Sequence, residues 1–161
     1  MYNPNIHFRK SIRCKNYDYS QNGYYFVTIC TQGKEFLFGR IENGKMLLND
    51  YGIIVENEWI QTATMRINIE LDEYVIMPNH IHVIIRINNG MELAGGGVKT
   101  ETFEQFGKPT SNSISTIIRG YKSSVTRQIN TLRNLQGMPV WQRNYYEHII
   151  RKEDDLKKVR E

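Results

Sequence analysis

Two histidines separated by one residue are the strongest chemical signal in the sequence. His80 and His82 lie in residues 77–85, which read MPNHIHVII. On a β-strand, residues i and i+2 point to the same face, so the two imidazoles would stand side by side with Cα atoms about 6–7 Å apart. Two neutral imidazoles at that spacing can chelate one divalent ion when a further ligand comes from elsewhere. The alternative is a pair of half-exposed strand histidines without a metal.

The residues around the pair favour the metal interpretation. The remainder of residues 80–87 is almost continuously apolar, which is typical of a strand covered on both faces. Two ionisable rings in such a strand incur a desolvation cost that a bound ion would offset. Of the other two histidines, His7 lies in a basic N-terminal segment and has no evident role. His148 is either a structural, hydrogen-bonded histidine or a group near the metal or DNA.

Basic residues are concentrated in two parts of the chain. Residues 1–15 hold four basic residues and no acid, and residues 111–152 hold seven against Glu147 alone. Residues 16–110 hold seven basic and twelve acidic residues, so their net charge is negative. This segregation favours a polyanionic partner, with a solvated surface as the alternative. The ten tyrosines and two tryptophans include possible stacking surfaces for bases, although most belong in a core.

Length and composition indicate one globular domain. The chain has 161 residues, 40% of them hydrophobic and 24% charged, which suits a single ordered domain. No apolar run approaches the roughly 20 residues of a membrane span, and residues 1–15 lack the apolar core of a signal peptide. The two cysteines, Cys14 and Cys30, form no disulfide framework. We therefore expect a reduced, cytoplasmic protein without a membrane partner.

Local patterns predict the elements that must position these residues. Residues 24–30 are aromatic and β-branched, as in a central strand. Asn43-Gly44 predicts a hairpin between residues 36–41 and 45–48. Asn49 or Asp50 would cap a helix over residues 51–63, and Ser113 would cap one over residues 114–133. The remaining predicted elements are strands over 67–77 and 80–87, a flexible loop over 88–112, a short strand followed by irregular structure within 140–150, and a helix from 153.

The order of these elements predicts the fold class. Strand, hairpin, helix, two strands, helix, strand and helix follow one another, which indicates an α+β fold with one mainly antiparallel sheet sandwiched by helices. We expect residues 1–161 to form one such domain, with residues 1–22 as a basic N-terminal arm within it.

Several blocks together resemble a known family. The block MPNHIHVI at 77–84 resembles the histidine–hydrophobic–histidine motif of the single-tyrosine HUH endonucleases, and most closely that of the REP-associated tyrosine transposases, which are relatives of insertion-sequence transposases. The likeness covers nearly the whole chain. It includes YDY at 17–19 through YFVTICT at 25–31, STIIRGYKS at 115–123 and VWQRNYYEHIIR at 140–151. The resemblance implies a ferredoxin-like fold of the HUH type.

The resemblance also implies an activity, which is metal-dependent cleavage and rejoining of single-stranded DNA that folds into hairpins. His80 and His82 would hold a divalent ion, Mg²⁺ or Mn²⁺, which would stabilise charge developing at the scissile phosphate. A tyrosine hydroxyl would attack that phosphate, leaving a 5′-phosphotyrosine and a free 3′-OH. DNA transposition and recombination are the corresponding processes.

The tyrosine that the family uses has no counterpart in this chain. It is expected on the final helix, at the position just after Glu161, and the further metal ligand is expected one helical turn later. We therefore expect a domain cut within its C-terminal helix that does not itself cleave DNA. Tyr145, Tyr146 and Tyr121 are weak substitutes, because an aromatic residue in the core or in base stacking is the more common explanation for each of them.

The basic residues and the oligomeric state complete the set of expectations. Phosphate contacts would give a salt-dependent affinity for DNA. The smallest insertion-sequence relatives act as dimers, whereas REP-associated members can act as monomers, so both states are open.

One rival function, a histidine-triad nucleotide hydrolase, needs a third alternate histidine where Ile84 stands. The other rival is a non-catalytic single-stranded nucleic-acid-binding protein. The predicted DNA-contacting residues are Arg9, Lys10, Arg13, Lys15, Arg119, Lys122, Arg127, Arg143 and Arg151.

Overall fold

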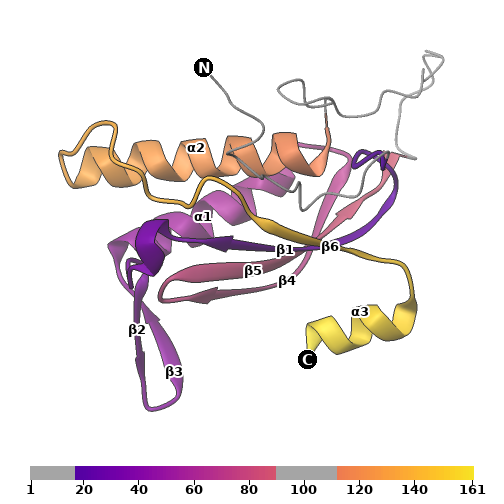
Figure 1. Ribbon diagram of the computed structural model, residues 1–161, viewed down its shortest axis with the longest axis horizontal. Helices are drawn as coiled ribbons and strands as arrows, with labels where there is room; N and C mark the ends of the chain where they lie inside the picture. The colour runs from indigo at the N-terminus through magenta and orange to yellow at the C-terminus, as the bar shows by residue number, and fades with distance from the viewer. Residues whose placement is uncertain (1–16, 90–111) are drawn as a thin grey trace, which may run out of the picture.

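A four-stranded antiparallel sheet lies at the centre of the computed structural model, which describes residues 17–89 and 112–161 (Figure 1). The strand order is β4-β5-β1-β6, and each strand runs antiparallel to its neighbours. With the helices between them, the strands follow the β-α-β-β-α-β order of ferredoxin-like domains. The predicted α+β class is therefore confirmed. The four strands are β1 (Gly23–Cys30), β4 (Ile69–Met77), β5 (His80–Ile87) and β6 (Tyr146–Ile150).

In residues 17–89 and 112–161, three α-helices cover the two faces of this sheet. Helices α1 (Asp50–Thr64) and α2 (Ile114–Leu132) lie on one face, and the short α3 (Glu153–Arg160) lies on the other (Figure 1). Among the described residues, no helix is long and apolar enough to span a membrane.

Side-chain caps begin the two long helices where the sequence predicts them. The side chain of Asn49 accepts a hydrogen bond from the Gly52 N–H at 2.9 Å, and the hydroxyl of Ser113 accepts one from the Thr116 N–H at 3.4 Å. These bonds satisfy amide groups that have no partner inside the helix. Of the two caps considered for α1, Asn49 is the one used.

The main core lies between the sheet and the α1–α2 layer. Trp59 of α1 and Tyr121 of α2 pack edge to face with ring centroids 5.3 Å apart. Tyr121 is buried, and its hydroxyl donates to the Val55 carbonyl at 3.0 Å. Alternate residues of the two central strands complete this core: Tyr25, Val27 and Ile29 from β1, and Ile81, Val83, Ile85 and Ile87 from β5.

A hairpin projects from the sheet between β1 and α1 (Figure 1). Its strands are β2 (Gly39–Glu42) and β3 (Lys45–Leu48), which follow a short 3₁₀ helix over Gln32–Lys34. Asn43 and Gly44 both have positive φ angles, 50° and 74°. These are the conformations that an Asn-Gly hairpin turn requires, so the predicted hairpin is confirmed.

The late segment differs from the prediction in the order of its parts. Residues 140–145 are irregular apart from a bridge between Trp141 and Thr31, and the strand comes afterwards as β6. Lys122 of α2 explains the irregular part, because its Nζ donates to the carbonyl oxygens of Gln142 and Arg143 at 2.6 and 3.3 Å. A side chain therefore satisfies backbone groups that a strand would have paired in a ladder.

Two other predicted segments are described only in part. Residues 1–16 of the basic arm and residues 90–111 of the loop lie outside the described residues. Within the remainder of the arm, Tyr19 is buried in the main core, and its carbonyl accepts a hydrogen bond from the Ile114 N–H at 3.2 Å. This end of the arm therefore packs against the start of α2.

Candidate metal and nucleic-acid site

His80 and His82 stand on the sheet face that carries α3, which we call the outer face. In an antiparallel pair, directly opposed residues point to the same side of the sheet. The register places Cys30 opposite His80 and Thr28 opposite His82. The residues between them, such as Ile81, point into the main core on the other face. The predicted alternation is therefore present, and both imidazoles emerge on one side.

The two imidazole rings are close together, and each is held by a neighbouring side chain. Their centroids are 4.7 Å apart. Nδ1 of His80 lies 2.7 Å from Oδ1 of Asn79, and Nδ1 of His82 lies 2.8 Å from Oγ1 of Thr28. An amide oxygen only accepts, so Nδ1 of His80 carries the proton, and the Thr28 hydroxyl can accept from His82 in the same way. Such partners leave Nε2 as the nitrogen with a free lone pair.

Partial burial keeps both rings in the protonation state that metal binding requires. Desolvation lowers the pKa of His80, and desolvation together with the neighbouring His80 lowers the pKa of His82. Both imidazoles are therefore neutral at pH 7, and a neutral imidazole is the form that ligates a metal.

The next question is which further side chains could ligate a metal beside the two histidines. Among residues 17–89 and 112–161, no group of three or more His, Cys, Asp or Glu side chains is arranged to hold a metal ion. The described part of the chain thus supplies two imidazoles that fit a divalent ion, with the remaining positions left for other ligands. A catalytic metal site needs such open positions for water or substrate.

Helix α3 covers only one part of the outer face. Leu156 of α3 packs with Ile84 of β5 and Ile150 of β6 in a second apolar cluster, with Phe26 of β1 partly buried against it. We call the outer-face residues under α3 the covered half. Phe26 also stacks on His82, with ring centroids 5.3 Å apart, so it joins the covered half to the histidines.

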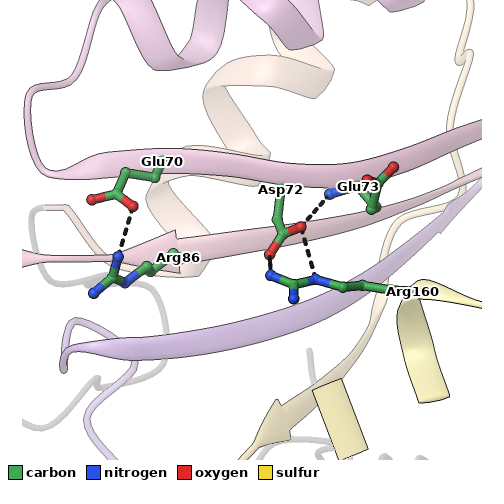
Figure 2. Close-up of polar contacts among 5 residues, drawn as sticks. All are labelled: Glu70, Asp72, Glu73, Arg86 and Arg160. Atoms are coloured by element: carbon green, nitrogen blue, oxygen red, sulfur yellow. Dashed lines mark hydrogen bonds and ion pairs between the residues drawn. The ribbon is translucent and has the colours of Figure 1, made fainter. Parts of the chain in front are cut away.

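A charged pair fixes the end of α3 to the edge strand β4. Arg160 binds both carboxylate oxygens of Asp72, its Nε lying 3.1 Å from Oδ1. Asp72 also accepts from the Glu73 N–H at 2.9 Å (Figure 2). The register between β4 and β5 shifts between Leu71 and Tyr74, so Asp72 lies in a bulge. A neighbouring pair, Glu70 with Arg86 at 2.9 Å, joins β4 to β5 without involving α3 (Figure 2).

The other part of the outer face, which we call the open half, carries the histidines. Three side chains share one row across the sheet, since Tyr146 of β6 is opposite Thr28 and Thr28 is opposite His82. Tyr146 is 51% exposed, and Val75 of β4, which continues the row, is 45% exposed. The open half therefore presents an aromatic ring beside the two imidazoles.

The three tyrosines named as weak substitutes for the nucleophile occupy different environments. Tyr146 is exposed on the outer face, two strands from His82. Tyr145 is partly buried against the main core. Burial raises the pKa of Tyr121. Tyr121 also lies on the sheet face that carries α1 and α2, opposite the histidines, which argues against attack on a substrate bound there.

Three of the predicted DNA-contacting residues come together beside α2, on the sheet face opposite the histidines. Lys122 and Arg127 of α2 and Arg143 of the following segment line one groove. Arg119 is exposed elsewhere on α2, and Arg151 is exposed between β6 and α3. Arg9, Lys10, Arg13 and Lys15 lie outside the described residues.

Apart from Asn79, the supporting residues of the site could not be found from the sequence. Asn79 is adjacent to His80, but Thr28 is 54 residues from His82, and only the strand register brings it there. The Asp72–Arg160 pair spans 88 residues. An Asn before the first histidine was the one local signal available.

The fold described above was compared with known proteins. No protein-family model matches the chain. A structure of a REP-associated tyrosine transposase bound to a REP hairpin superposes with a TM-score of 0.52 at 18% identity. The match covers 94% of this chain and 66% of that transposase, so the chain spans just under two thirds of its length. The likeness supports the ferredoxin-like fold assigned above.

A sequence relative matches over almost the full chain. It is a protein of Haemophilus influenzae, described as uncharacterized, that is 42% identical over 164 residues. The match covers 99% of this chain and 88% of the relative. Identity of this extent leaves no doubt of common descent, and the chain belongs to the same family as this Haemophilus influenzae protein.

Proposed function

We propose that this protein binds hairpin-forming single-stranded DNA at the open half, and that with a tyrosine nucleophile in place it cleaves and rejoins this DNA as an HUH transposase does. The observation that carries the proposal is the pair of adjacent neutral imidazoles, each held at Nδ1, on an uncovered part of the sheet. The fold shared with a hairpin-bound transposase supports the same conclusion.

His80 and His82 would hold the divalent ion, Mg²⁺ or Mn²⁺. When bound, the ion would stabilise negative charge that develops on a phosphodiester. Asn79 and Thr28 would keep the two rings oriented, and Phe26 would support His82 from its side. Such outer partners fix the tautomer and increase metal affinity.

A tyrosine hydroxyl would supply the nucleophile. Its oxygen forms a bond to phosphorus while the bond from phosphorus to the 3′ oxygen breaks, and the 3′ oxygen takes up a proton. Within the described chain, Tyr146 is the exposed tyrosine that shares a row with His82.

Non-catalytic binding of single-stranded nucleic acid is the second candidate. The exposed Tyr146 ring favours it, because aromatic side chains stack on bases without needing a metal. The two functions make different predictions for the effect of a divalent ion on binding.

The test measures binding of a labelled DNA hairpin with a single-stranded flank, in Mn²⁺ and in EDTA, by the 161-residue chain. We expect Mn²⁺ to tighten binding, and His80→Ala with His82→Ala to abolish that gain. His148→Ala is the matched control, because His148 is exposed on the same sheet face, and it should retain the gain.

Denaturing electrophoresis of the same samples reports any covalent adduct. An adduct formed by this chain should require the histidine pair and should disappear in Tyr146→Phe. Equal DNA affinity in Mn²⁺ and EDTA would support the non-catalytic function and overturn the metal-dependent one.

A further inference from the structure

A groove lies on the sheet face that carries α1 and α2, and the histidine site does not use it. It has a volume of about 480 Å³ and lies between α2 and residues 137–143. Pro139, Val140 and Trp141 supply its apolar lining. Ser123, Thr126 and Asn130 of α2 add polar groups. A ligand with both apolar and hydrogen-bonding parts would fit this lining.

The charge of the groove has one sign. Its lining includes Lys122, Arg127 and Arg143, and no acidic residue is among the described residues that line it. Positive charge without acidic partners attracts an anion, and two or more cations spaced along a groove suit a polyanion better than a single anionic group. The chemistry of the groove therefore matches a phosphodiester backbone.

The three cations do not have equal roles. Nζ of Lys122 already donates to the carbonyl oxygens of Gln142 and Arg143, and burial lowers the pKa of this lysine to about 8. Lys122 thus holds residues 142–143 against α2. Arg127 and Arg143 are exposed, so their guanidinium groups are the ones able to contact phosphates.

The groove and the open half meet at one edge of the sheet. β6 is an edge strand, and the chain passes from Arg143 in the groove to Tyr146 at the start of β6. From Tyr146, the outer-face row continues through Thr28 to His82. Two strand spacings, roughly 10 Å, separate β6 from β5. A continuous path of cation, aromatic ring and imidazole therefore turns around this edge.

We propose that one single-stranded nucleic acid occupies this whole path. Arg127 and Arg143 bind its backbone in the groove, Tyr146 stacks on a base at the β6 edge, and the next phosphates reach His80 and His82. This assignment rests on the proposed function for its last part, whereas the groove contacts stand by themselves. It makes the groove a second binding region on the opposite side of the sheet from the metal site.

The test compares two charge-matched double variants of the 161-residue chain. Arg127→Gln with Arg143→Gln removes the exposed groove cations and leaves the Lys122 contacts in place. Arg40→Gln with Lys45→Gln removes the same charge from the exposed β2–β3 hairpin. Binding of a DNA hairpin with a single-stranded flank is measured between 50 and 200 mM salt, with and without Mn²⁺.

We expect the groove variant to bind about 10-fold or more weakly at low salt. Its slope of log affinity against log salt should be smaller by about 1.4, as expected for two lost phosphate contacts on a single strand. The hairpin variant should bind as the unchanged chain does. As the flank is shortened stepwise, the difference between groove variant and unchanged chain should vanish while the Mn²⁺ effect remains.

Other outcomes would separate the groove assignment from the metal-dependent function. If the groove variant binds like the unchanged chain while Mn²⁺ still tightens binding, the groove assignment is wrong and the proposed function stands. If the groove variant is weakened but Mn²⁺ has no effect, the groove contacts stand, and both the metal-dependent function and the continuous path are overturned. Equal weakening at every flank length also overturns the continuous path.

Discussion

The covered half and the open half of the outer face are built from the same strands, but the first packs against α3 and the second carries the two histidines. On β5, Ile84 is 2% exposed beneath α3, whereas His82, two residues earlier, is only partly buried beside solvent. On β1, Phe26 packs in the covered half and Thr28 in the open one. One strand therefore changes from a packing surface to a polar site within a single alternation.

The means of stabilisation differ between the halves in the same way. The covered half combines apolar packing by Leu156 with the pair formed by Arg160 and Asp72 (Figure 2). The open half has hydrogen bonds to each imidazole and little burial. We infer that folding depends on the covered half and ligand binding on the open half. Substitutions in each half can test this difference.

Substitutions in the two halves should differ most in their effect on the free energy of unfolding. Ile84→Ala should lower the free energy of unfolding by about 2–5 kcal/mol, because it leaves a cavity under α3. His82→Ala should lower it by less than about 1 kcal/mol, since it removes one hydrogen bond and relieves desolvation of the ring. Urea denaturation followed by circular dichroism measures both. Equal losses would show that the open half is as important for folding as the covered half.

The next effect concerns metal affinity. Thr28→Val removes the hydroxyl that holds Nδ1 of His82 and nearly preserves side-chain size. We expect Mn²⁺ affinity to fall about 10- to 100-fold, as is usual when the outer partner of a ligating histidine is lost. Thr64→Val is a suitable control, because Thr64 is exposed on α1 and bonds only its own helix. Calorimetric titration should find the control unchanged, and an equal fall in both variants would refute the role of Thr28.

A smaller effect tests how α3 is held. Asp72→Asn should speed amide hydrogen exchange throughout α3, whereas Glu70→Gln should leave α3 unchanged, because its partner Arg86 belongs to the sheet. Arg160 lowers the pKa of Asp72, so this contribution is present above the unfolded-state pKa of about 3.9. It is lost as pH falls through the lower folded-state value. Similar exchange in α3 for the two variants would contradict a specific role for Asp72.

A weaker effect is a change in the titration of the two histidines. His80 and His82 have folded-state pKa values below the unfolded value of about 6.5. The unfolded state therefore binds protons first, and stability falls as pH drops from that value toward the folded ones. NMR titration of the ring signals measures this directly. His80→Gln should raise the pKa of His82, because one cause of its low value is removed, and a further decrease would contradict this coupling.

Local sequence patterns were sufficient for most elements of the fold. Asn43-Gly44 predicted a turn that needs positive φ, and Ser113 predicted the start of α2, because each interaction lies within a few residues. The alternation of His80 and His82 likewise depends only on strand geometry. These features could be predicted because no distant partner decides them.

Features that depend on distant contacts could not be predicted. The irregular segment before β6 follows from Lys122 binding the carbonyls of Gln142 and Arg143, about 20 residues away. The support of His82 by Thr28 depends on the register of β1 against β5. The role of Asp72 depends on a bulge and on α3 crossing to β4. In each case, tertiary packing decides which local alternative is adopted.

Crystals of the 161-residue chain grown with Mn²⁺ would show, through the anomalous signal of the metal, whether His80 and His82 hold the ion. We expect one strong peak on the open half, within about 2.0–2.3 Å of Nε2 of both His80 and His82. We also expect Asn79 and Thr28 to keep their contacts with Nδ1. A peak in the groove or beside Asp72, with none at the two histidines, would contradict the assignment of the metal site.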